Sequence, residues 1–435
     1  MTETVNLKIE GGQKLSGEIT TNTSKNATVA LLCASVLNQG KTTLKNVPKI
    51  EEVARIIEVL ESIGVKITKS GNDLIIQPPA KLKLAKMDLE AAAKTRSALL
   101  LIGALVHREK SFSFPHSGGC KLGERTVRPH LFALEKFGVK IVSRENHYEI
   151  KTKKLKPAEI ILYEIGDTVT ENALLVASLI PGETVIKLAS GNYMVRDLCY
   201  FLQKLGVQIE GIGSSTLTIN GARELNQDIE FELSEDPIES MLFLAIAATT
   251  NSSLKIKRCP IDFLELELLK LEKMGLKFKL SKRYKSKNGE TDLVDITTKS
   301  SKLKALEEKI HPLPFPGINI DNLPFFVPIA TQARGTTLIH DWVYENRAIY
   351  YLELNKLGAK IMFADPHRVY IEGLTELRGT EVICPPALRP AAIILIAMLA
   401  ARGTSILRNI YSINRGYEDL VTRLKKLGAK IEVVV

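Results

Sequence analysis

The chain has 435 residues, 45% of them hydrophobic, and a formal net charge of +10. This length allows two domains with separate cores, whereas the longest apolar run, residues 391–401, is far shorter than the roughly 20 residues of a membrane span. No export signal opens the sequence, and five scattered cysteines favour a reducing compartment, so we expect a cytoplasmic protein with no membrane role.

The positive charge fits either a nucleic-acid binder or an enzyme that acts on anionic small molecules. Lysine runs at 151–156 and 279–287 favour neither class, because such runs are usually solvated loops, and few aromatic residues accompany them. We therefore expect no nucleic-acid partner. The absence of CxxC, HExxH and clustered histidines predicts no metal site, and we expect no cofactor.

Six similar segments predict the architecture. In each one a helix ends at a glycine, and alternating apolar and mostly basic residues then begin a half-buried strand. The glycines lie 68 to 83 residues apart, at Gly64, Gly138, Gly206, Gly275, Gly358 and Gly428. This interval is too long for a solenoid repeat, so each unit is a small subdomain of about 70 residues.

A nearly all-apolar helical run precedes each of these segments. Such helices have no polar face and must be surrounded by protein, whereas the second helix of each unit is amphipathic, as at residues 51–61. Each unit is predicted as helix, strand, helix, strand, with buried helices at the centre of an α/β domain and sheets outside. The runs are residues 27–37, 97–106, 173–180, 241–248, 325–333 and 391–401.

The first two apolar helices begin next to cations. Ser24 is a candidate cap, and Lys25 follows it at the start of an apolar helix, where a buried charge needs a partner. Arg96 lies at the start of the second apolar helix, at the end where the helix dipole disfavours cations. Either a carboxylate or a bound phosphate would compensate these charges.

The loop at residues 115–125 is the most informative one. Gly118 and Gly119 allow close approach of a ligand, and Cys120 follows them, flanked by Lys121 and Arg125, which favour its thiolate form. The other four cysteines, Cys33, Cys199, Cys259 and Cys384, are expected to be buried and inert.

The third unit opens at Gly166 with a turn that is either a ligand-facing segment or a plain capping box. The polar turn at residues 234–237 is the candidate crossing between domains, and Asp236 and Glu239 are candidate helix caps there.

The last two units carry cations at positions equivalent to those of the cations in the first two. Lys25, Arg96 and Arg389 precede or open the apolar helices, and Arg125, Arg347 and Arg415 occupy a second equivalent position. Equivalent positions of a repeat fold lie on equivalent faces, so these cations are predicted to converge on a gap between the two halves. The sequence therefore predicts a cleft that binds a multiply charged anion.

These residues occur in motifs that resemble those of the enolpyruvyl transferases, in the branch that acts on UDP-N-acetylglucosamine rather than the shikimate-pathway branch. The motifs follow the family order along the whole chain: Ser24-Lys25-Asn26-Ala27, Gly118-Gly119-Cys120 with Gly123 and Arg125, Tyr344-Glu345-Asn346-Arg347 and Arg415-Gly416-Tyr417-Glu418.

The resemblance implies two inside-out α/β domains, each of three units. It also implies that both chain ends share one domain, which predicts residues 25–234 as one domain and residues 1–24 with 235–435 as the other. A monomer is expected.

The resemblance further implies transfer of the enolpyruvyl group of phosphoenolpyruvate to the 3-hydroxyl of a UDP-sugar, with release of phosphate, for peptidoglycan synthesis. Cys120 matches the family's general acid, and Asp321 matches the aspartate that exchanges the hydroxyl proton. The implied phosphoenolpyruvate ligands are Lys25, Arg96, Arg125, Arg347, Arg389 and Arg415. The implied sugar-nucleotide ligands are Asn26, Arg96, Arg125, Gly166, Asp321 and Val343.

The chain departs from the family pattern near the expected nucleotide. Arg128 stands where the family commonly has an aspartate, and Glu164 stands where it has a serine. Residues 318–320 also differ from the family's Phe-Pro-Thr. A divergent homologue that uses another nucleotide sugar, and a non-catalytic protein that binds a nucleotide sugar, are the alternatives.

Overall fold

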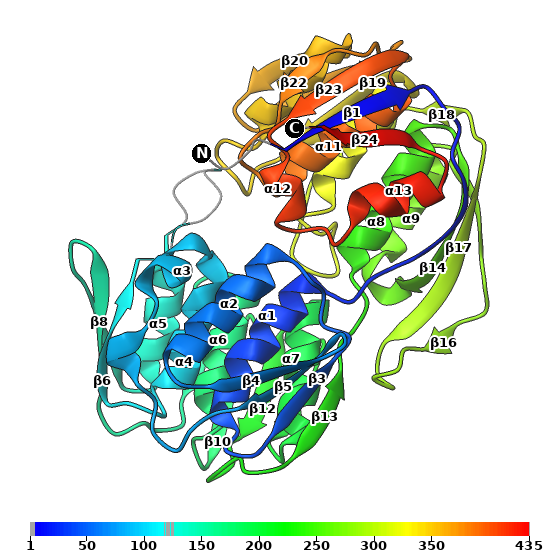
Figure 1. The fold of residues 1–435 in the computed structure, drawn as a ribbon. Coiled ribbons are helices and arrows are strands. Elements are labelled where there is room, and N and C mark those ends of the chain that lie inside the picture. Colours follow the sequence, from blue (N-terminus) through cyan, green and yellow to red (C-terminus); the bar gives the residue numbers. More distant parts are fainter. Residues whose placement is uncertain (1–4, 117, 119–121, 123–125, 435) are drawn as a thin grey trace. The chain divides into compact units, whose positions relative to one another are not determined.

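In the computed structural model, which describes residues 5–116, 118, 122 and 126–434, the chain forms two compact units (Figure 1). Outside the loop around residue 120, the middle unit runs from Thr23 to Ser234. The terminal unit combines the residues up to Asn22 with those from Glu235 onward. Apart from that loop, the chain passes from one unit to the other at two points, between Asn22 and Thr23 and between Ser234 and Glu235.

The middle unit places its sheets around a helical centre. The central helices are α1 (Lys25–Ala34), α4 (Leu100–Leu105) and α6 (Asp167–Ala177). The outer helices are α2 (Glu51–Ser62), α3 (Leu89–Lys94), α5 (Arg128–Lys136) and α7 (Tyr193–Lys204). Short 3-10 helices are η1 (Ser35–Leu37), η2 (Leu84–Lys86) and η3 (Arg96–Leu99).

The described residues of the middle unit form three sheets. The first has the strand order β13 (Ile229–Glu232), β3 (Thr42–Lys45), β5 (Asp73–Gln77), β4 (Lys66–Ser70). The second has the order β6 (Ser111–Pro115), β8 (His147–Thr152), β7 (Val139–Ser143). The third has the order β11 (Gln208–Glu210), β12 (Thr216–Asn220), β10 (Glu183–Lys187), β9 (Glu159–Ile161).

The terminal unit repeats this plan. Its central helices are α8 (Pro237–Thr249), α10 (Phe326–Thr331), which follows η5 (Leu323–Phe325), and α11 (Leu388–Ala400). The outer elements are η4 (Ile261–Phe263), α9 (Glu265–Lys273), η6 (Ala348–Leu357), α12 (Tyr411–Asn414) and α13 (Leu420–Lys426).

Three sheets also surround the terminal unit's helices in the described part of the chain. One has the order β15 (Lys277–Leu280), β17 (Asp292–Lys299), β14 (Ser253–Pro260), β2 (Ser16–Thr20), with β16 (Tyr284–Lys285) beside β17. The next has the order β18 (Leu303–Lys304), β19 (Ala333–His340), β21 (Arg368–Gly373), β20 (Lys360–Asp365). The last has the order β22 (Glu381–Ile383), β23 (Gly403–Arg408), β1 (Asn6–Gly11), β24 (Lys430–Val434).

Hydrophobicity explains which helices lie at the centre. Every residue of α8 is buried, because its run of apolar side chains leaves no face suited to water. By contrast, α2 buries Val53, Ile56, Ile57, Val59 and Leu60 and leaves its charged residues outside the core, at least partly accessible to solvent. The prediction of buried central helices with sheets outside is confirmed for each unit.

The six repeat glycines follow the predicted geometry. Each has a positive φ, between 90° and 99°, which side chains other than glycine rarely adopt. The predicted order of helix, strand, helix, strand was incomplete, however. After five of the six glycines a second strand returns antiparallel to the first, as in β4 with β5 and β20 with β21, whereas β24 after Gly428 pairs with β1. Short polar turns hid these hairpins, since their strands are half-exposed and weakly alternating.

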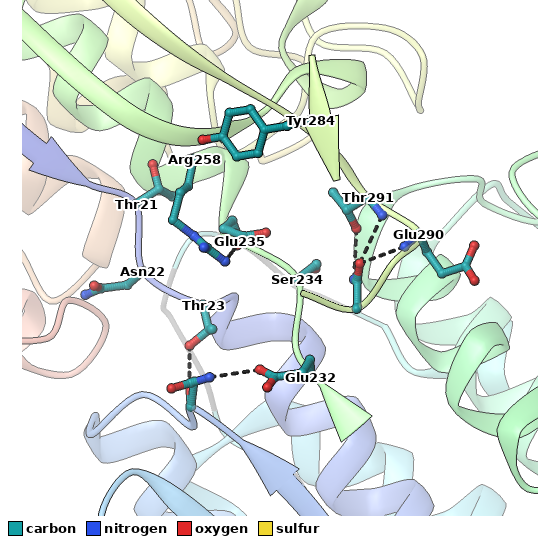
Figure 2. A network of polar contacts seen from close by, with 12 residues as sticks. Thr21, Asn22, Thr23, Glu232, Ser234, Glu235, Arg258, Tyr284, Glu290 and Thr291 are labelled. Atoms are coloured by element: carbon teal, nitrogen blue, oxygen red, sulfur yellow. Dashed lines mark hydrogen bonds and ion pairs between the residues drawn. The ribbon is translucent and has the colours of Figure 1, made fainter. Parts of the chain in front are cut away.

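Both crossings are tied to the unit on each side (Figure 2). In the middle unit, Thr23 Oγ1 donates to Asn46 O at 2.6 Å, and Asn46 Nδ2 donates to Glu232 Oε2 at 2.8 Å. In the terminal unit, the buried carboxylate of Glu235 pairs with Arg258. The backbone that enters and leaves the central helices is thereby fixed within each unit.

Candidate active site

The middle unit places four predicted site residues at the starts of its central helices. Lys25 and Asn26 are the first two residues of α1, and Ser24 caps this helix by accepting a hydrogen bond from the backbone N–H of Ala27 at 3.1 Å. Arg96 opens η3, which leads into α4, and Gly166 is the N-cap of α6. Cys120 and Arg125, the predicted acid and its neighbouring cation, lie outside the described residues.

The partner of Lys25 is a carboxylate. Lys25 Nζ lies 2.7 Å from Glu52 Oε2, with the two side chains 13% and 18% exposed. The other oxygen of Glu52 accepts hydrogen bonds from Ser97 Oγ at 2.6 Å and from Thr95 Oγ1 at 3.2 Å. Within the middle unit, the carboxylate of Glu52 therefore holds both Lys25, in the first repeat, and the segment beside Arg96, in the second repeat.

Glu52 is a residue that the sequence analysis missed. It lies in the first turn of α2, where the helix dipole favours an acidic group. Its pairing answers the question of what compensates the charge of Lys25, because a carboxylate does so without a bound anion. The acidic pair Glu51-Glu52 at a helix start was the available signal, but the distance of 27 residues to Lys25 concealed the contact.

Arg96 lies next to a neutral, buried histidine. Its Nη2 donates to the backbone oxygen of Thr126 at 2.8 Å. Burial, together with the charge of Arg96, lowers the pKa of His130 to about 4, so the ring is uncharged at neutral pH. The Nδ2 atom of Asn172 donates to His130 Nδ1 at 3.0 Å, and Asn172 Oδ1 accepts from the backbone N–H of Gly103 at 2.8 Å. A side chain at Gly103 would collide with Asn172, so glycine is required where α4 approaches α6.

The terminal unit brings two predicted residues together around a tyrosine. Arg389, the second residue of α11, places Nη2 at 3.4 Å from Asp321 Oδ2 and donates from Nη1 to Tyr417 Oη at 2.7 Å. The arginine is almost buried, whereas the carboxylate is 27% exposed. Burial raises the pKa of the Tyr417 phenol, so the tyrosine is a neutral acceptor for the guanidinium.

The turn that carries Asp321 is held from the core by Glu267, another residue that the sequence analysis missed. Glu267 Oε1 accepts from the backbone N–H of Asn319 at 3.1 Å and from Asn322 Nδ2 at 2.9 Å. In turn, Asn319 Oδ1 accepts from the backbone N–H of Asp321 at 2.9 Å. Asn319, in the segment expected to differ from the family pattern, thus provides a polar anchor for this turn.

Arg415 follows α12, and its Nε is buried without a hydrogen-bond partner in the part of the chain that the structure describes. The next residue, Gly416, lies so close to Leu388 that a Cβ there would come within 2.2 Å of Leu388 Cδ2. A side chain at this position would displace Leu388, so glycine packs the Arg415 segment closely against the start of α11, beside Arg389.

Arg347 occupies a different environment from the one predicted. Its side chain has no exposed surface, and Nε and Nη2 form a two-pronged pair with Asp341 at 2.6 and 2.7 Å. Tyr351 Oη donates to the same carboxylate at 2.5 Å. Arg347 is therefore a core residue here rather than part of a cationic wall, because Asp341 is buried beside it. Val343, predicted near the nucleotide, is 40% exposed.

The chain is similar to known proteins over nearly its whole length. The family model of EPSP synthase (3-phosphoshikimate 1-carboxyvinyltransferase) matches residues 9–432. The chain belongs to this family of enolpyruvyl transferases. UDP-N-acetylglucosamine 1-carboxyvinyltransferase of Treponema denticola is 35% identical over 98% of each chain, and that of Bradyrhizobium diazoefficiens is 31% identical over 98% of this chain and 97% of its own.

Solved structures agree on the enolpyruvyl transferase fold. The enolpyruvyl transferase NikO from Streptomyces tendae superposes with a TM-score of 0.81 at 24% identity, over 99% of both chains. EPSP synthase from Acinetobacter baumannii reaches a TM-score of 0.76 at 18% identity, over 99% of this chain and 100% of its own. The predicted pair of inside-out α/β domains is the fold of this family.

Buried thiols of this enolpyruvyl transferase behave as predicted. Cys33, Cys199, Cys259 and Cys384 are free and buried, and burial raises the pKa of Cys259 and of Cys384 to about 12. Among the described residues, no group of three His, Cys, Asp or Glu side chains is arranged to hold a metal ion. Within the same residues, no helix is both long and apolar enough to cross a membrane.

The two departures from the family pattern lie on the surface of the middle unit. Arg128 is the exposed first residue of α5, and Glu164 is exposed just before α6. Glu164 Oε1 lies 3.7 Å from where a Cβ on Gly166 would be, so its carboxylate is next to the predicted sugar-nucleotide residue Gly166.

Proposed function

We propose that this enolpyruvyl transferase moves the enolpyruvyl group of phosphoenolpyruvate to the 3-hydroxyl of UDP-N-acetylglucosamine, the first committed step of peptidoglycan synthesis. The observation that carries the proposal is full-length similarity to enzymes of that name, at 35% identity for the Treponema denticola enzyme. The motifs at Lys25-Asn26, Arg389 and Arg415 support it. We also infer a monomeric, cytoplasmic enzyme that binds neither nucleic acid nor membrane.

The reaction proceeds by addition and elimination. In the addition, Asp321 takes the proton of the sugar hydroxyl, the hydroxyl oxygen bonds to C2 of phosphoenolpyruvate, and Cys120 gives a proton to the methylene carbon. A tetrahedral intermediate results. In the elimination, a proton leaves the new methyl group, the double bond re-forms, and the bond from C2 to the phosphate oxygen breaks to release phosphate.

Cations bind the substrates' negative charges in this proposal. Lys25, Arg125 and Arg415 hold the phosphate and carboxylate of phosphoenolpyruvate, and Arg96 and Arg389 add further positive charge. Arg389 also orients Asp321, since its guanidinium lies 3.4 Å from that carboxylate. Arg347 acts through the core instead, by holding Asp341. The sugar nucleotide contacts Asn26, Arg96, Arg125, Gly166, Asp321 and Val343.

The decisive experiment is release of phosphate from phosphoenolpyruvate, measured with and without UDP-N-acetylglucosamine. We expect phosphate release that depends on the sugar nucleotide, and a product with the mass of the enolpyruvyl adduct. Cys120→Ala is expected to lose turnover and to lose labelling by fosfomycin, an epoxide that attacks the equivalent thiol in this family. Cys384→Ala is the matched control, because its thiol is buried and stays protonated, and it should keep both.

A second acceptor is favoured by one observation. The exposed side chains of Arg128 and Glu164 replace groups of opposite or no charge near the expected nucleotide. A panel of nucleotide sugars in the same assay tests this alternative, since a higher kcat/KM with another sugar would replace the acceptor. Proton exchange into phosphoenolpyruvate distinguishes an enzyme, whichever sugar it uses, from a non-catalytic binding protein, which has no reason to catalyse this exchange.

A further inference from the structure

Asn26, the proposed sugar-binding amide, has a buried partner on another helix. Its Nδ2 donates to Tyr193 Oη at 3.0 Å, across 167 residues of sequence. Asn26 is the second residue of α1 and Tyr193 the first residue of α7, and these two helices pack together in the middle unit. Tyr193 is only 1% exposed, whereas Asn26 is half-buried. The ring is therefore fixed in the core, and the amide lies at its edge.

A set of polar contacts fixes the backbone that carries Tyr193. Asn192 caps α7 by accepting from the backbone N–H of Tyr193 at 2.9 Å. Asn192 Nδ2 donates to Asp167 Oδ2 at 3.1 Å, and Ser190 Oγ donates to Asp167 Oδ1 at 2.6 Å. Both oxygens of Asp167, the first residue of α6, thus hold the turn before α7.

The same turn is tied to α6 a second time. The backbone N–H of Ser190 donates to Thr170 Oγ1 at 3.0 Å, and Thr170 Oγ1 donates to the carbonyl oxygen of Gly166 at 2.7 Å. Gly166 is itself a proposed sugar-nucleotide residue. The turn that positions Tyr193 and the turn that starts at Gly166 therefore form one connected unit.

Tyr193 restricts the orientation of the Asn26 amide. The terminal torsion of asparagine is broad, so an isolated amide samples many orientations. With one N–H bound to Tyr193, the amide keeps its carbonyl oxygen and a second N–H for a ligand, in a fixed plane. A binding group that is already oriented loses less conformational freedom when the ligand arrives, which increases affinity.

We propose that Tyr193 is a positioning residue for the acceptor sugar, which it serves by orienting Asn26. This inference rests on the proposed function, because it assigns Asn26 to the acceptor and not to phosphoenolpyruvate. The competing explanation is that the hydrogen bond only satisfies a buried hydroxyl, in which case its loss changes stability and leaves substrate affinity alone.

Steady-state kinetics of the full-length enzyme with both substrates test the inference. Tyr193→Phe removes the hydroxyl and keeps the ring. It is expected to raise KM for UDP-N-acetylglucosamine about tenfold, with kcat and the KM for phosphoenolpyruvate within about twofold of wild type. Tyr200→Phe is the matched control, since it lies two turns along the same helix, roughly 10 Å away, and should leave all three constants unchanged.

A double-mutant cycle tests whether the effect passes through Asn26. Asn26→Ala alone and Asn26→Ala with Tyr193→Phe should have the same KM for the sugar nucleotide. An additive effect overturns the inference, as does an unchanged KM in Tyr193→Phe when the wild-type enzyme is active. If the wild-type enzyme shows no release dependent on UDP-N-acetylglucosamine, the proposed function fails first and the inference fails with it.

Discussion

The two units share one repeat plan and solve the burial of polar groups differently. In the middle unit, burial keeps three titratable groups neutral: it lowers the pKa of His107 and of His130 to about 4 and raises that of Glu171 well above its ordinary value. The terminal unit instead pairs buried arginines with carboxylates, which are buried in Arg347 with Asp341 and Arg423 with Glu239 and partly exposed in Arg389 with Asp321.

This difference shows that a repeated backbone does not impose one electrostatic arrangement. A neutral buried group needs only hydrogen bonds, whereas a buried ion pair must recover the free energy of desolvating two charges. The stability contributed by the middle unit should therefore depend mainly on pH. The stability contributed by the terminal unit should fall most when one member of a buried ion pair is removed.

Breaking the ion pair between Arg347 and Asp341 should cause the greatest loss of stability. Arg347→Met leaves Asp341 buried without its cation, which should lower the free energy of unfolding by about 3–5 kcal/mol. Urea denaturation of the full chain measures the loss. Arg368→Met is the control, since its pair with Asp365 is accessible to solvent and should contribute little to stability. Equal losses in the two variants would show that burial does not distinguish them.

The next prediction concerns the pH dependence of stability in the middle unit, through His130. The folded pKa of His130, about 4, is below its unfolded value, so the unfolded chain binds the extra proton between roughly pH 6.5 and 4. Stability from this group is present above that window and is lost as the pH falls through it, by up to about 3 kcal/mol.

His130→Asn should therefore flatten the fall in stability between pH 7 and pH 4, measured by urea denaturation at several pH values. His147→Asn, on the half-exposed hairpin strand β8, serves as the matched control. A variant whose slope equals that of the wild-type chain would contradict a neutral His130 in the folded state.

The third effect concerns Tyr417 in the terminal unit. Tyr417→Phe removes the acceptor of Arg389 Nη1 and leaves a buried donor without its partner, which should lower stability by about 1–3 kcal/mol. Because Arg389 lies beside Asp321, kcat should fall as well. Tyr411→Phe, at a half-exposed position, is the control for loss of a hydroxyl. A Tyr417 variant with the kcat of the wild-type enzyme would show that the hydrogen bond to Arg389 does not contribute to catalysis.

The smallest expected effect lies in the middle unit, at Glu52. Glu52→Gln keeps acceptors for Ser97 and Thr95 but removes the charge that holds Lys25. We expect KM for phosphoenolpyruvate to rise about fivefold while that for the sugar nucleotide stays constant. Glu51→Gln, which breaks an ion pair with Arg55 on the same turn, is the control. A change in the sugar-nucleotide KM alone would assign Lys25 to the other substrate.

The sequence alone determined the repeat. Six glycines that need a positive φ and six apolar helical runs are local features, so the buried central helices and outer sheets of both units could be predicted before any contact was known. The resemblance to the family also predicted Lys25, Asn26, Asp321 and Arg389 as site residues. What local patterns could not show was the return strand of each hairpin, because half-exposed strands carry a weak signal.

The pairing of polar groups became visible only in the folded chain. Glu52 reaches Lys25 across 27 residues, Tyr417 reaches Arg389 across 28, and Tyr193 reaches Asn26 across 167. The folded chain also places Arg347 in the core beside Asp341 rather than on a cationic surface. The physical reason is that a charge or hydroxyl in the sequence has many possible partners, and packing of the helices selects one of them.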